Sequence, residues 1–378
     1  MTFFDFKNSA TPVYILDEKL LTNNLQLLNY VQETSGAKVI LALKGFAMFR
    51  TFDLVKQYLS GTTASSLHEA KLGSEELGKE VHAYCPAYVS SDFEKMMSAC
   101  NHFTFNSLSE WERYKPQIQN SANAISCGLR INPEFSEVST NLYNPCRLGS
   151  RLGITADLLG NSLPKGIEGL HFHTLCESSA ESLEKTLAIV EQKFGHLLAA
   201  AKWLNMGGGH AITRKGYNVE LLIRLITTIS ERYELEIILE PGSAVAWETG
   251  YLLASVLDIV ENNGMKTAML DTSFATHLPD CLEMPYRPKV WGAIEESEHC
   301  YNLGGLTCLS GDFIENYCFR KPLQVGDKLI FDDMIHYTMV KNHTFNGIQL
   351  PNIGIWKDDK GFELVKSFGY EDYKSRLS

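Results

Sequence analysis

One lysine stands where a run of apolar residues ends, and an amine in such a place can do covalent chemistry. The segment Val39–Phe46 predicts a buried strand whose carboxyl end carries Lys44. Apolar surroundings disfavour the charged ammonium, so the amine becomes nucleophilic near neutral pH, as a Schiff base with an aldehyde requires. The alternative is a strand-end lysine whose amine extends into solvent.

Two further motifs offer an anion site and a carboxylate. Three consecutive glycines, Gly207, Gly208 and Gly209, follow a predicted strand, and backbone N–H groups without Cβ obstruction can converge on a phosphate. Glu240 closes the next strand and is followed by Pro-Gly. Beside a pyridine nitrogen, this carboxylate would favour the protonated ring, which is the better electron sink. A flexible turn and a turn carboxylate are the structural alternatives.

Two histidines, His171 and His173, share one face of a predicted strand. No matching third ligand stands out, so we expect no metal site. A flat imidazole that stacks on a flat coenzyme is the functional interpretation of His173, and a histidine satisfied within the core is the structural one.

A glycine-framed loop in the last third of the chain carries Cys308 and Asp312. In such a loop the thiol can supply a proton and the carboxylate can bind an amine. Free cysteines, however, are more often small apolar residues of the core. Tyr337 follows, and its hydroxyl either donates to a phosphate or lies half-buried on a strand.

The elements that must position these groups alternate between strands and helices. Strand-like segments end near Ala42, Ala64, Cys85, Phe105, Ile131, His173, Met206 and Glu240. Amphipathic helices are predicted at 17–33, 46–59, 67–77, 92–99, 108–118, 180–200 and 219–233, with a short helix near Ala156. This order predicts an α/β fold, a (β/α)8 barrel over residues 17–250. The glycine triplet and Glu240 then end strands seven and eight, whose loops often bind phosphate in such barrels.

The pattern changes after about residue 250, where short strands are joined by turns. Strands are predicted at 251–260, 266–270, 300–303, 328–331 and 353–356. We expect a mostly antiparallel β-domain built from residues 251–378 together with residues 1–16, because the strand near Val13 should join it.

Composition narrows the class of protein. The 378 residues carry a formal charge of −11 without a basic stripe, which argues against nucleic acid as a partner. No apolar run reaches the roughly 18 residues of a membrane span, and no export signal precedes the first strand, so we expect no membrane partner. The nine cysteines are scattered without a Cys-x-x-Cys pair, which argues against a disulfide framework and favours a cytoplasmic protein.

Taken in order, Lys44, His173, the glycine triplet, Glu240-Pro-Gly, Cys308, Asp312 and Tyr337 resemble the fold-type III, alanine racemase-like, pyridoxal-phosphate decarboxylases. The resemblance spans nearly the whole chain. Within this group, residues 42–46, 271–280 and 283–288 are similar to the carboxynorspermidine (carboxyspermidine) decarboxylases of polyamine biosynthesis.

The resemblance implies pyridoxal 5'-phosphate as the cofactor and a role for each motif. Lys44 would bind the coenzyme covalently and His173 would stack on its ring. Glu240 would pair with the ring nitrogen. The glycine triplet and Tyr337 would hold the phosphate, with Ser243 standing where relatives often have a phosphate-binding arginine.

The resemblance also implies a homodimer with shared active sites, in which Cys308 and Asp312 serve the partner's site. A carboxylated polyamine carries positive amines, which acidic side chains near the mouth should hold. The candidate substrate-binding residues are Glu240, Asp271, Asp280 and Asp312, with His277 and Glu248 as weaker ones. The proton that returns to the substrate would come from Cys308 or from Lys44.

Two alternatives stay open. The first is a diaminopimelate-type or other basic amino-acid decarboxylase on the same scaffold, for which Arg147 and Arg151 would bind the far carboxylate. The second is a non-catalytic pyridoxal-phosphate-binding barrel, against which the segment from 251 to 378 argues.

Overall fold

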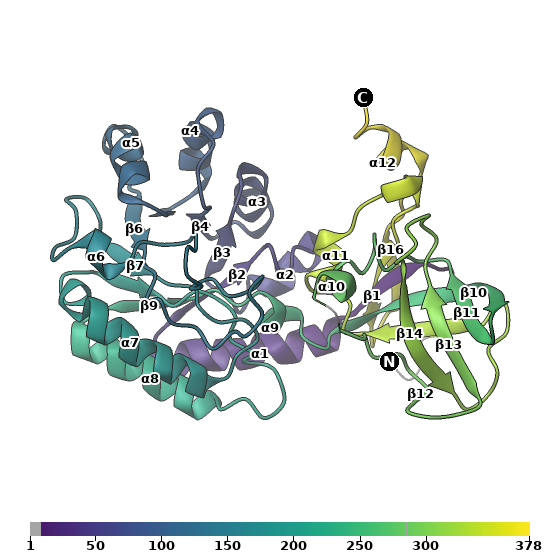
Figure 1. Ribbon diagram of the computed structural model, residues 1–378. Coiled ribbons are helices and arrows are strands. Elements are labelled where there is room, and N and C mark those ends of the chain that lie inside the picture. Colours follow the sequence, from purple (N-terminus) through teal and green to yellow (C-terminus); the bar gives the residue numbers. More distant parts are fainter. Residues whose placement is uncertain (1–8, 285) are drawn as a thin grey trace. The chain divides into compact units, whose positions relative to one another are not determined.

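The computed structural model describes residues 9–284 and 286–378 of the chain (Figure 1). It divides into two compact units. One unit contains residues 24–245, and the other combines the N-terminal residues up to Asn23 with residues 246–378. The domain limits expected from the sequence, 17–250 and 1–16 with 251–378, stay predictions.

The first unit is a closed barrel in which, within the described residues, eight strands pair in parallel with their neighbours in chain order. The strands are β2 (Lys38–Ala42), β3 (Gly61–Ala64), β4 (Glu80–Tyr84), β5 (His102–Phe105), β6 (Ser126–Arg130), β7 (Gly169–His171), β8 (Trp203–Asn205) and β9 (Glu236–Leu239). Pairing of β2 with β9 closes the ring. The predicted (β/α)8 barrel is confirmed, and each predicted strand end lies within two residues of the observed one.

Helices cover the outside of this barrel, and α7 and α8 run side by side along it (Figure 1). The helices are α2 (Phe52–Val55), α3 (Leu67–Leu72), α4 (Ser90–Ala99), α5 (Leu108–Gln119), α6 (Ala156–Leu159), α7 (Ala180–Leu198), α8 (Val219–Tyr233) and α9 (Ser243–Ala246). The helix α1 (Glu18–Ser35) precedes β2. The helix predicted at 46–59 is shorter than expected, because the residues after Lys44 form a turn in which Gly45 and Phe46 both donate to the Ala42 carbonyl.

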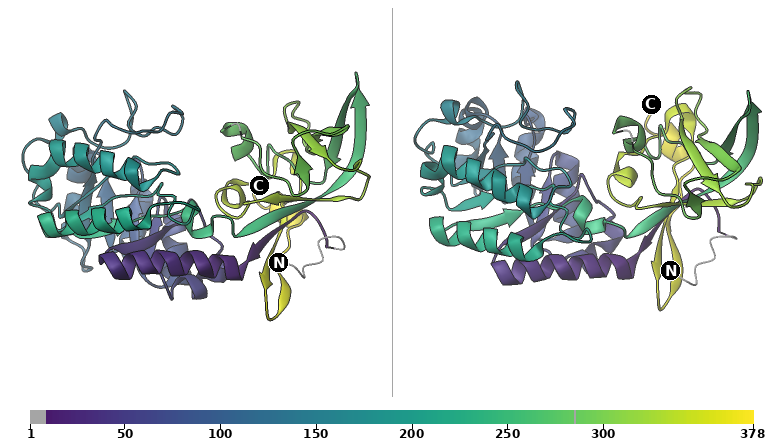
Figure 2. Two further views of the ribbon diagram at one scale, coloured as in Figure 1. Left: turned by 90° about the horizontal axis from the view of Figure 1, so that it is seen from below. Right: turned by 60° about the horizontal axis from the view of Figure 1, so that its bottom comes forward.

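The second unit is built on one mixed, mostly antiparallel sheet, as predicted. Its nine described strands are β1 (Val13–Asp17), β10 (Gly250–Asn262), β11 (Met265–Leu270), β12 (Ala293–Ile294), β13 (His299–Gly304), β14 (Phe313–Phe319), β15 (Lys328–Asp332), β16 (Asn352–Lys357) and β17 (Gly361–Lys366). The N-terminal β1 pairs with β10 and β16, so the first strand of the chain lies inside the C-terminal sheet. Figure 2 shows the yellow β16–β17 hairpin beside purple β1. The short helices α10 (Asp280–Glu283), α11 (Thr338–Lys341) and α12 (Tyr370–Lys374) lie between or after these strands.

The barrel interior is filled by side chains near the amino ends of its strands. Ile40, Trp203 and Ile238 form a buried cluster there. Glycine at positions 128 and 169 makes room for the indole, because a Cβ at either place would lie within 2.2 Å of a Trp203 ring atom. The functional groups are expected at the carboxyl ends of the strands, where the active sites of (β/α)8 barrels lie.

Two further features bear on the expectations from composition. Cys300 and Cys318 lie opposite each other on β13 and β14 and form a disulfide, which the scattered cysteine pattern did not predict. The other seven cysteines are free thiols. Within residues 9–284 and 286–378, each helix is too short or too polar to traverse a lipid bilayer.

Candidate active site

Lys44 lies just beyond the carboxyl end of β2, next to the turn that carries Glu240. The two turns touch: a Cβ on Gly45 would lie 2.7 Å from the Gly242 Cα, and the Ala42 N–H donates to the Pro241 carbonyl at 2.9 Å. Glycine is required at position 45 because any side chain would meet backbone there. The glycine that follows the lysine therefore brings the β2 and β9 ends together.

The Lys44 side chain is reachable by solvent, yet protein atoms surround it on most sides. Loss of water around the amine lowers its pKa below the usual value, and the nearby Arg130 guanidinium acts in the same direction, while Glu240 opposes them. The net direction favours the neutral amine. A neutral amine that a small molecule can reach is the state needed to attack an aldehyde.

Glu240 is an ionised carboxylate held inside the barrel. Burial alone would raise its pKa, but the His171 ring, the Asn205 amide and the Lys44 amine together lower the pKa to about 2. One carboxylate oxygen, Oε1, accepts from the Asn205 Nδ2 at 2.8 Å, and the other, Oε2, lies 3.6 Å from the His171 Nε2. Glu240 therefore stays negatively charged at neutral pH despite being only 8% exposed.

Asn205 is a site residue that the sequence interpretation missed. While its Nδ2 donates to Glu240, its Oδ1 accepts the Gly207 N–H at 2.8 Å. The buried amide thus ties the carboxylate on β9 to the first residue of the glycine triplet after β8. Its signal in the sequence was a polar residue inside an otherwise apolar strand, at a position that faces inward with His171.

His173 is fixed by the same glycine loop. The Gly208 N–H donates to the His173 Nδ1 at 2.9 Å, so the ring carries any proton of its neutral form on Nε2. Burial, with help from the Lys44 amine, lowers the pKa of His173 well below its usual value. The imidazole is therefore a neutral, oriented ring.

The glycine triplet is shaped by close backbone approach. A Cβ on Gly208 would lie 2.3 Å from the Glu240 carbonyl oxygen, and one on Gly209 would lie 2.0 Å from the Leu175 oxygen. Gly207 and Gly209 also have positive φ values of 67° and 83°. The Gly207 and Gly208 N–H groups are bonded within the protein, and the Ala211 N–H donates to the Ser178 carbonyl at 3.1 Å, so Gly209 is the member of the triplet best suited to meet an anion.

Arg130, at the end of β6, is a second residue that the sequence interpretation passed over. It is 4% exposed, its guanidinium lies 4.7 Å from the Tyr84 ring centroid, and it donates to the His173 carbonyl at 3.1 Å. An arginine that follows buried strand residues was the available signal. Its positive charge helps to lower the pKa of the Lys44 amine and of the His173 ring.

These features fit an aldehyde coenzyme with an aromatic ring and a phosphate. The barrel presents a nucleophilic amine, a neutral imidazole in a fixed orientation and an ionised carboxylate. It also presents a loop of three glycines in which a Cβ at any position would clash with neighbouring atoms. Ser243 follows Gly242 as the first residue of α9 and is 9% exposed. It lies on the same turn as Glu240.

The remaining predicted residues lie in the sheet unit. Cys308 is exposed, and its N–H donates to the Asn346 Oδ1 at 2.8 Å. Asp312 is 4% exposed and accepts hydrogen bonds from its own unit. Tyr337 precedes α11 with a φ of 26°.

The other three predicted tail-binding residues also have partners in the sheet unit. Asp271 accepts the Ser255 N–H at 2.7 Å. His277 is completely buried, its Nδ1 lies 3.0 Å from the Thr272 Oγ1, and burial lowers its pKa to about 4. Asp280 forms an ion pair with Lys341. Their contact with a substrate stays a prediction, and complete burial makes His277 the least accessible of them.

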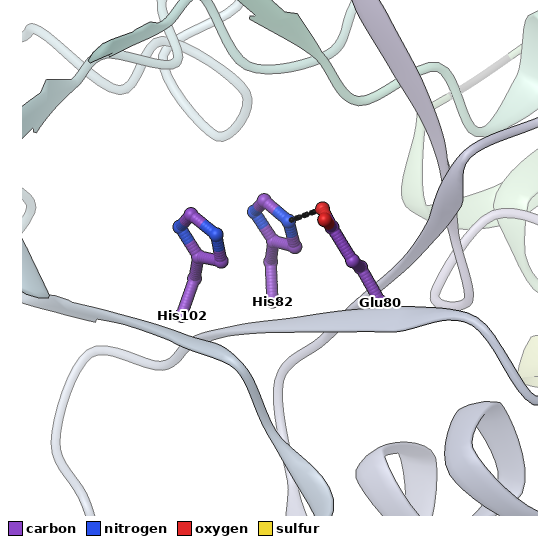
Figure 3. Close-up of side chains that lie close together, drawn as sticks. All are labelled: Glu80, His82 and His102. Atoms are coloured by element: carbon purple, nitrogen blue, oxygen red, sulfur yellow. Dashed lines mark hydrogen bonds and ion pairs between the residues drawn. The ribbon is translucent and has the colours of Figure 1, made fainter. Parts of the chain in front are cut away.

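A separate polar cluster lies at the other end of the barrel strands, where Glu80, His82 and His102 place ligand-type atoms within 4.8 Å of one another (Figure 3). The two rings are stacked at 4.0 Å with 4° between their planes. Lone pairs of parallel rings do not converge on one ion, and the Lys38 amine already holds the Glu80 Oε1 at 3.0 Å. This geometry favours a structural cluster of ion-paired and stacked side chains over a metal centre.

Comparisons with known proteins cover nearly the whole chain. A family model described as "Pyridoxal-dependent decarboxylase, C-terminal sheet domain" matches residues 13–335. The carboxyaminopropylagmatine decarboxylase of Synechocystis sp. is 50% identical over 370 residues, covering 97% of this chain and 95% of that protein. The carboxynorspermidine/carboxyspermidine decarboxylase of Campylobacter jejuni is 45% identical over 384 residues, covering 98% and 99%.

A solved structure agrees with this similarity. The crystal structure of carboxynorspermidine decarboxylase from Campylobacter jejuni, complexed with norspermidine, aligns with a TM-score of 0.90. The sequences are 44% identical, and the alignment covers 97% of this chain and 100% of that one.

Proposed function

Because the chain belongs to the family of pyridoxal-dependent decarboxylases, we propose that it removes carbon dioxide from carboxynorspermidine or carboxyspermidine to give norspermidine or spermidine in polyamine biosynthesis. The observation that carries this proposal is the Lys44 amine, which has a lowered pKa and lies beside the ionised Glu240 at the carboxyl end of the barrel. Relatives of 45% and 37% identity that carry this name over nearly their full length support the substrate.

Pyridoxal 5'-phosphate, when bound, supplies an aldehyde for the amine and a ring that accepts the electron pair left by departing carbon dioxide. Lys44 would hold it covalently, and Glu240 would keep a proton on the ring nitrogen through its negative charge. His173 would cover one ring face. Gly209, Ser243 and Tyr337 would bind the phosphate.

After carbon dioxide leaves, the Cα of the substrate needs a proton. We assign this donation to Cys308 of the partner subunit in a homodimer with shared sites: its S–H bond breaks, the new C–H bond forms, and solvent returns a proton to the thiolate. Cys308 is exposed on its own unit, which leaves its thiol free to reach a neighbouring subunit. We also infer a cytoplasmic location, which seven free thiols support.

A second substrate is favoured by a specific observation, the 50% identity to a carboxyaminopropylagmatine decarboxylase. That name describes a carboxylated aminopropyl group whose far end is a guanidinium instead of an ammonium. Reaction at the carboxylated end needs the same Lys44 and Glu240, so the two candidates differ only in how the tail is bound. Measuring kcat/KM for both compounds, with diaminopimelate as a third, ranks them directly.

The covalent role of Lys44 is tested by borohydride reduction of the protein incubated with pyridoxal 5'-phosphate. The expected result is a stable adduct on the peptide that contains Lys44, and no adduct in Lys44→Ala. Lys38→Ala, at the other end of β2 from Lys44, is the control and should still be labelled at Lys44. A Lys44→Ala protein that keeps both the imine absorbance and near-normal turnover would refute the proposal.

A further inference from the structure

Asp312 is a buried carboxylate whose two oxygens are shared among four donors of its own unit. The Ala275 N–H donates to Oδ1 at 2.9 Å, and the Ser273 hydroxyl donates to Oδ2 at 2.9 Å. The Thr307 N–H and the Thr307 hydroxyl both donate to Oδ2, at 3.0 and 2.6 Å. The loop passes so close to this carboxylate that a Cβ on Gly305 would lie 2.4 Å from Oδ2.

This arrangement leaves little capacity to bind a substrate amine. A carboxylate offers about four acceptor positions, two on each oxygen, and here three donors share Oδ2 and one bonds Oδ1, which leaves at most one position on Oδ1. With only 4% of its surface exposed, Asp312 is also shielded from a ligand. The Asp312 hydrogen bonds join the turn at residues 273–275 to Thr307, the residue before Cys308.

A second side chain bonds the next backbone N–H of the loop. The Cys308 N–H donates to the Asn346 Oδ1 at 2.8 Å, from a segment 38 residues further along the chain. Asn346 has a left-handed φ of 57°, a conformation that asparagine tolerates better than most residues. Leu306 and residues 308–311 are exposed, and the loop is held by these two side chains together with the Leu306 N–H, which donates to the Thr272 carbonyl at 3.1 Å.

We propose that Asp312 and Asn346 are positioning residues that fix the backbone from which the Cys308 thiol is presented. This inference rests on the proposed function, in which that thiol gives a proton to the Cα of the substrate. Proton transfer to carbon requires the reacting atoms to be about 3–3.5 Å apart, so a loop that drifts by about 1 Å loses much of the rate. The Thr307 N–H and the Cys308 N–H each donate to one of these two side chains, which restricts that movement.

The test uses the ratio of carbon dioxide released to amine product formed. When Cα is protonated in every turnover, this ratio is one. When protonation there fails, the proton would be taken up on the coenzyme instead, so that hydrolysis releases an aldehyde and the substrate nitrogen stays with the coenzyme. Carbon dioxide is then released without amine product, and the ratio rises. The ratio does not depend on how much of the enzyme is folded, and a purely structural defect leaves it unchanged.

The variants are Asp312→Asn, Asn346→Ala and the matched pair Thr307→Val and Thr307→Ser. We expect the ratio to rise above one in Asp312→Asn and Thr307→Val, because each loses a hydrogen bond of the buried carboxylate and protonation at Cα slows about tenfold. Asn346→Ala loses the exposed bond to the Cys308 N–H and should raise the ratio less. Thr307→Ser keeps the hydroxyl and should behave as wild type. Asp327→Asn, which alters a turn carboxylate bonded to the Gln324 N–H, is the control.

Amide hydrogen exchange of the peptide spanning residues 305–310 gives a readout without coenzyme or substrate. Exchange at Thr307 and Cys308 should be about tenfold faster in Asp312→Asn and Asn346→Ala than in wild type. Should Asp312→Asn fail to fold, Thr307→Val and Asn346→Ala carry the test alone.

Two results overturn the inference in distinguishable ways. If Cys308→Ala keeps a ratio of one, the proposed proton donor is wrong and the positioning role falls with it. If Cys308→Ala raises the ratio but Thr307→Val and Asn346→Ala leave it at one while their amide exchange accelerates, the thiol acts as proposed and these anchors do not position it.

Discussion

Replacing Asn205 by alanine tests the buried network that holds Glu240. The substitution removes the donor to the Glu240 Oε1 and the acceptor of the Gly207 N–H, two hydrogen bonds of 2.8 Å each. Losing a bond to a charged group costs about 1.5–3 kcal/mol, and leaving a buried N–H unpaired costs about 1–3 kcal/mol. We therefore expect the free energy of unfolding to fall by about 3 kcal/mol or more.

The same change should act on the ionisation of Glu240. With the amide gone, the carboxylate loses one of the groups that lower its pKa to about 2, so that pKa rises. A carboxyl with a depressed pKa stabilises the fold above its unfolded value of 4.5, and this contribution is lost as the pH falls from 4.5 towards 2. Asn205→Ala should lose it at a higher pH than wild type.

Urea unfolding at several pH values and absorbance titration with pyridoxal 5'-phosphate measure both effects. The matched control is Asn132→Ala, because Asn132 is a buried barrel asparagine whose Oδ1 accepts the Glu134 N–H at 2.8 Å. We expect the control to cost about 1 kcal/mol and to leave coenzyme affinity unchanged, and Asn205→Ala to weaken that affinity about tenfold. Equal stability of the two variants, with wild-type coenzyme affinity in both, would refute the network.

Three further changes have defined outcomes. Gly208→Ala places a Cβ 2.3 Å from the Glu240 carbonyl oxygen, so we expect a thermal midpoint lowered by several degrees, and an unchanged midpoint would show that this backbone contact can relax. Burial lowers the pKa of His277 from 6.5 to about 4, so the unfolded chain binds the proton first and stability should fall as the pH drops from 6.5 to 4. His277→Gln should flatten that slope in urea titrations, and an unaltered slope would assign it to other groups. Asp280→Asn should raise KM for carboxynorspermidine if the acid contacts the amine tail, whereas an unchanged KM alongside an effect on stability would leave it the partner of Lys341.

Much of the architecture was already present in local patterns. Lys44, the triple glycine after Met206 and the carboxylate before Pro241-Gly242 each stand at the end of a predicted strand. The alternation of strand and helix periods along the chain predicts a closed barrel. Because carboxyl ends of parallel strands meet at one rim, residues far apart in the chain can be assigned to one site without coordinates.

What each side chain contacts at that rim was decided by tertiary structure. The partner of Asn205 lies 35 residues away and that of Cys308 lies 38 residues away, and periodicity carries no information on such pairings. The amino acids at positions 240 and 312 are both acidic in the sequence, yet one keeps an oxygen directed towards a histidine in the barrel and the other accepts four hydrogen bonds within the sheet unit. The sequence by itself determines which chemical groups are present and at which strand ends they lie; barrel closure and loop packing determine which of them remain free to act, because hydrogen bonds between distant segments form only once the chain has folded.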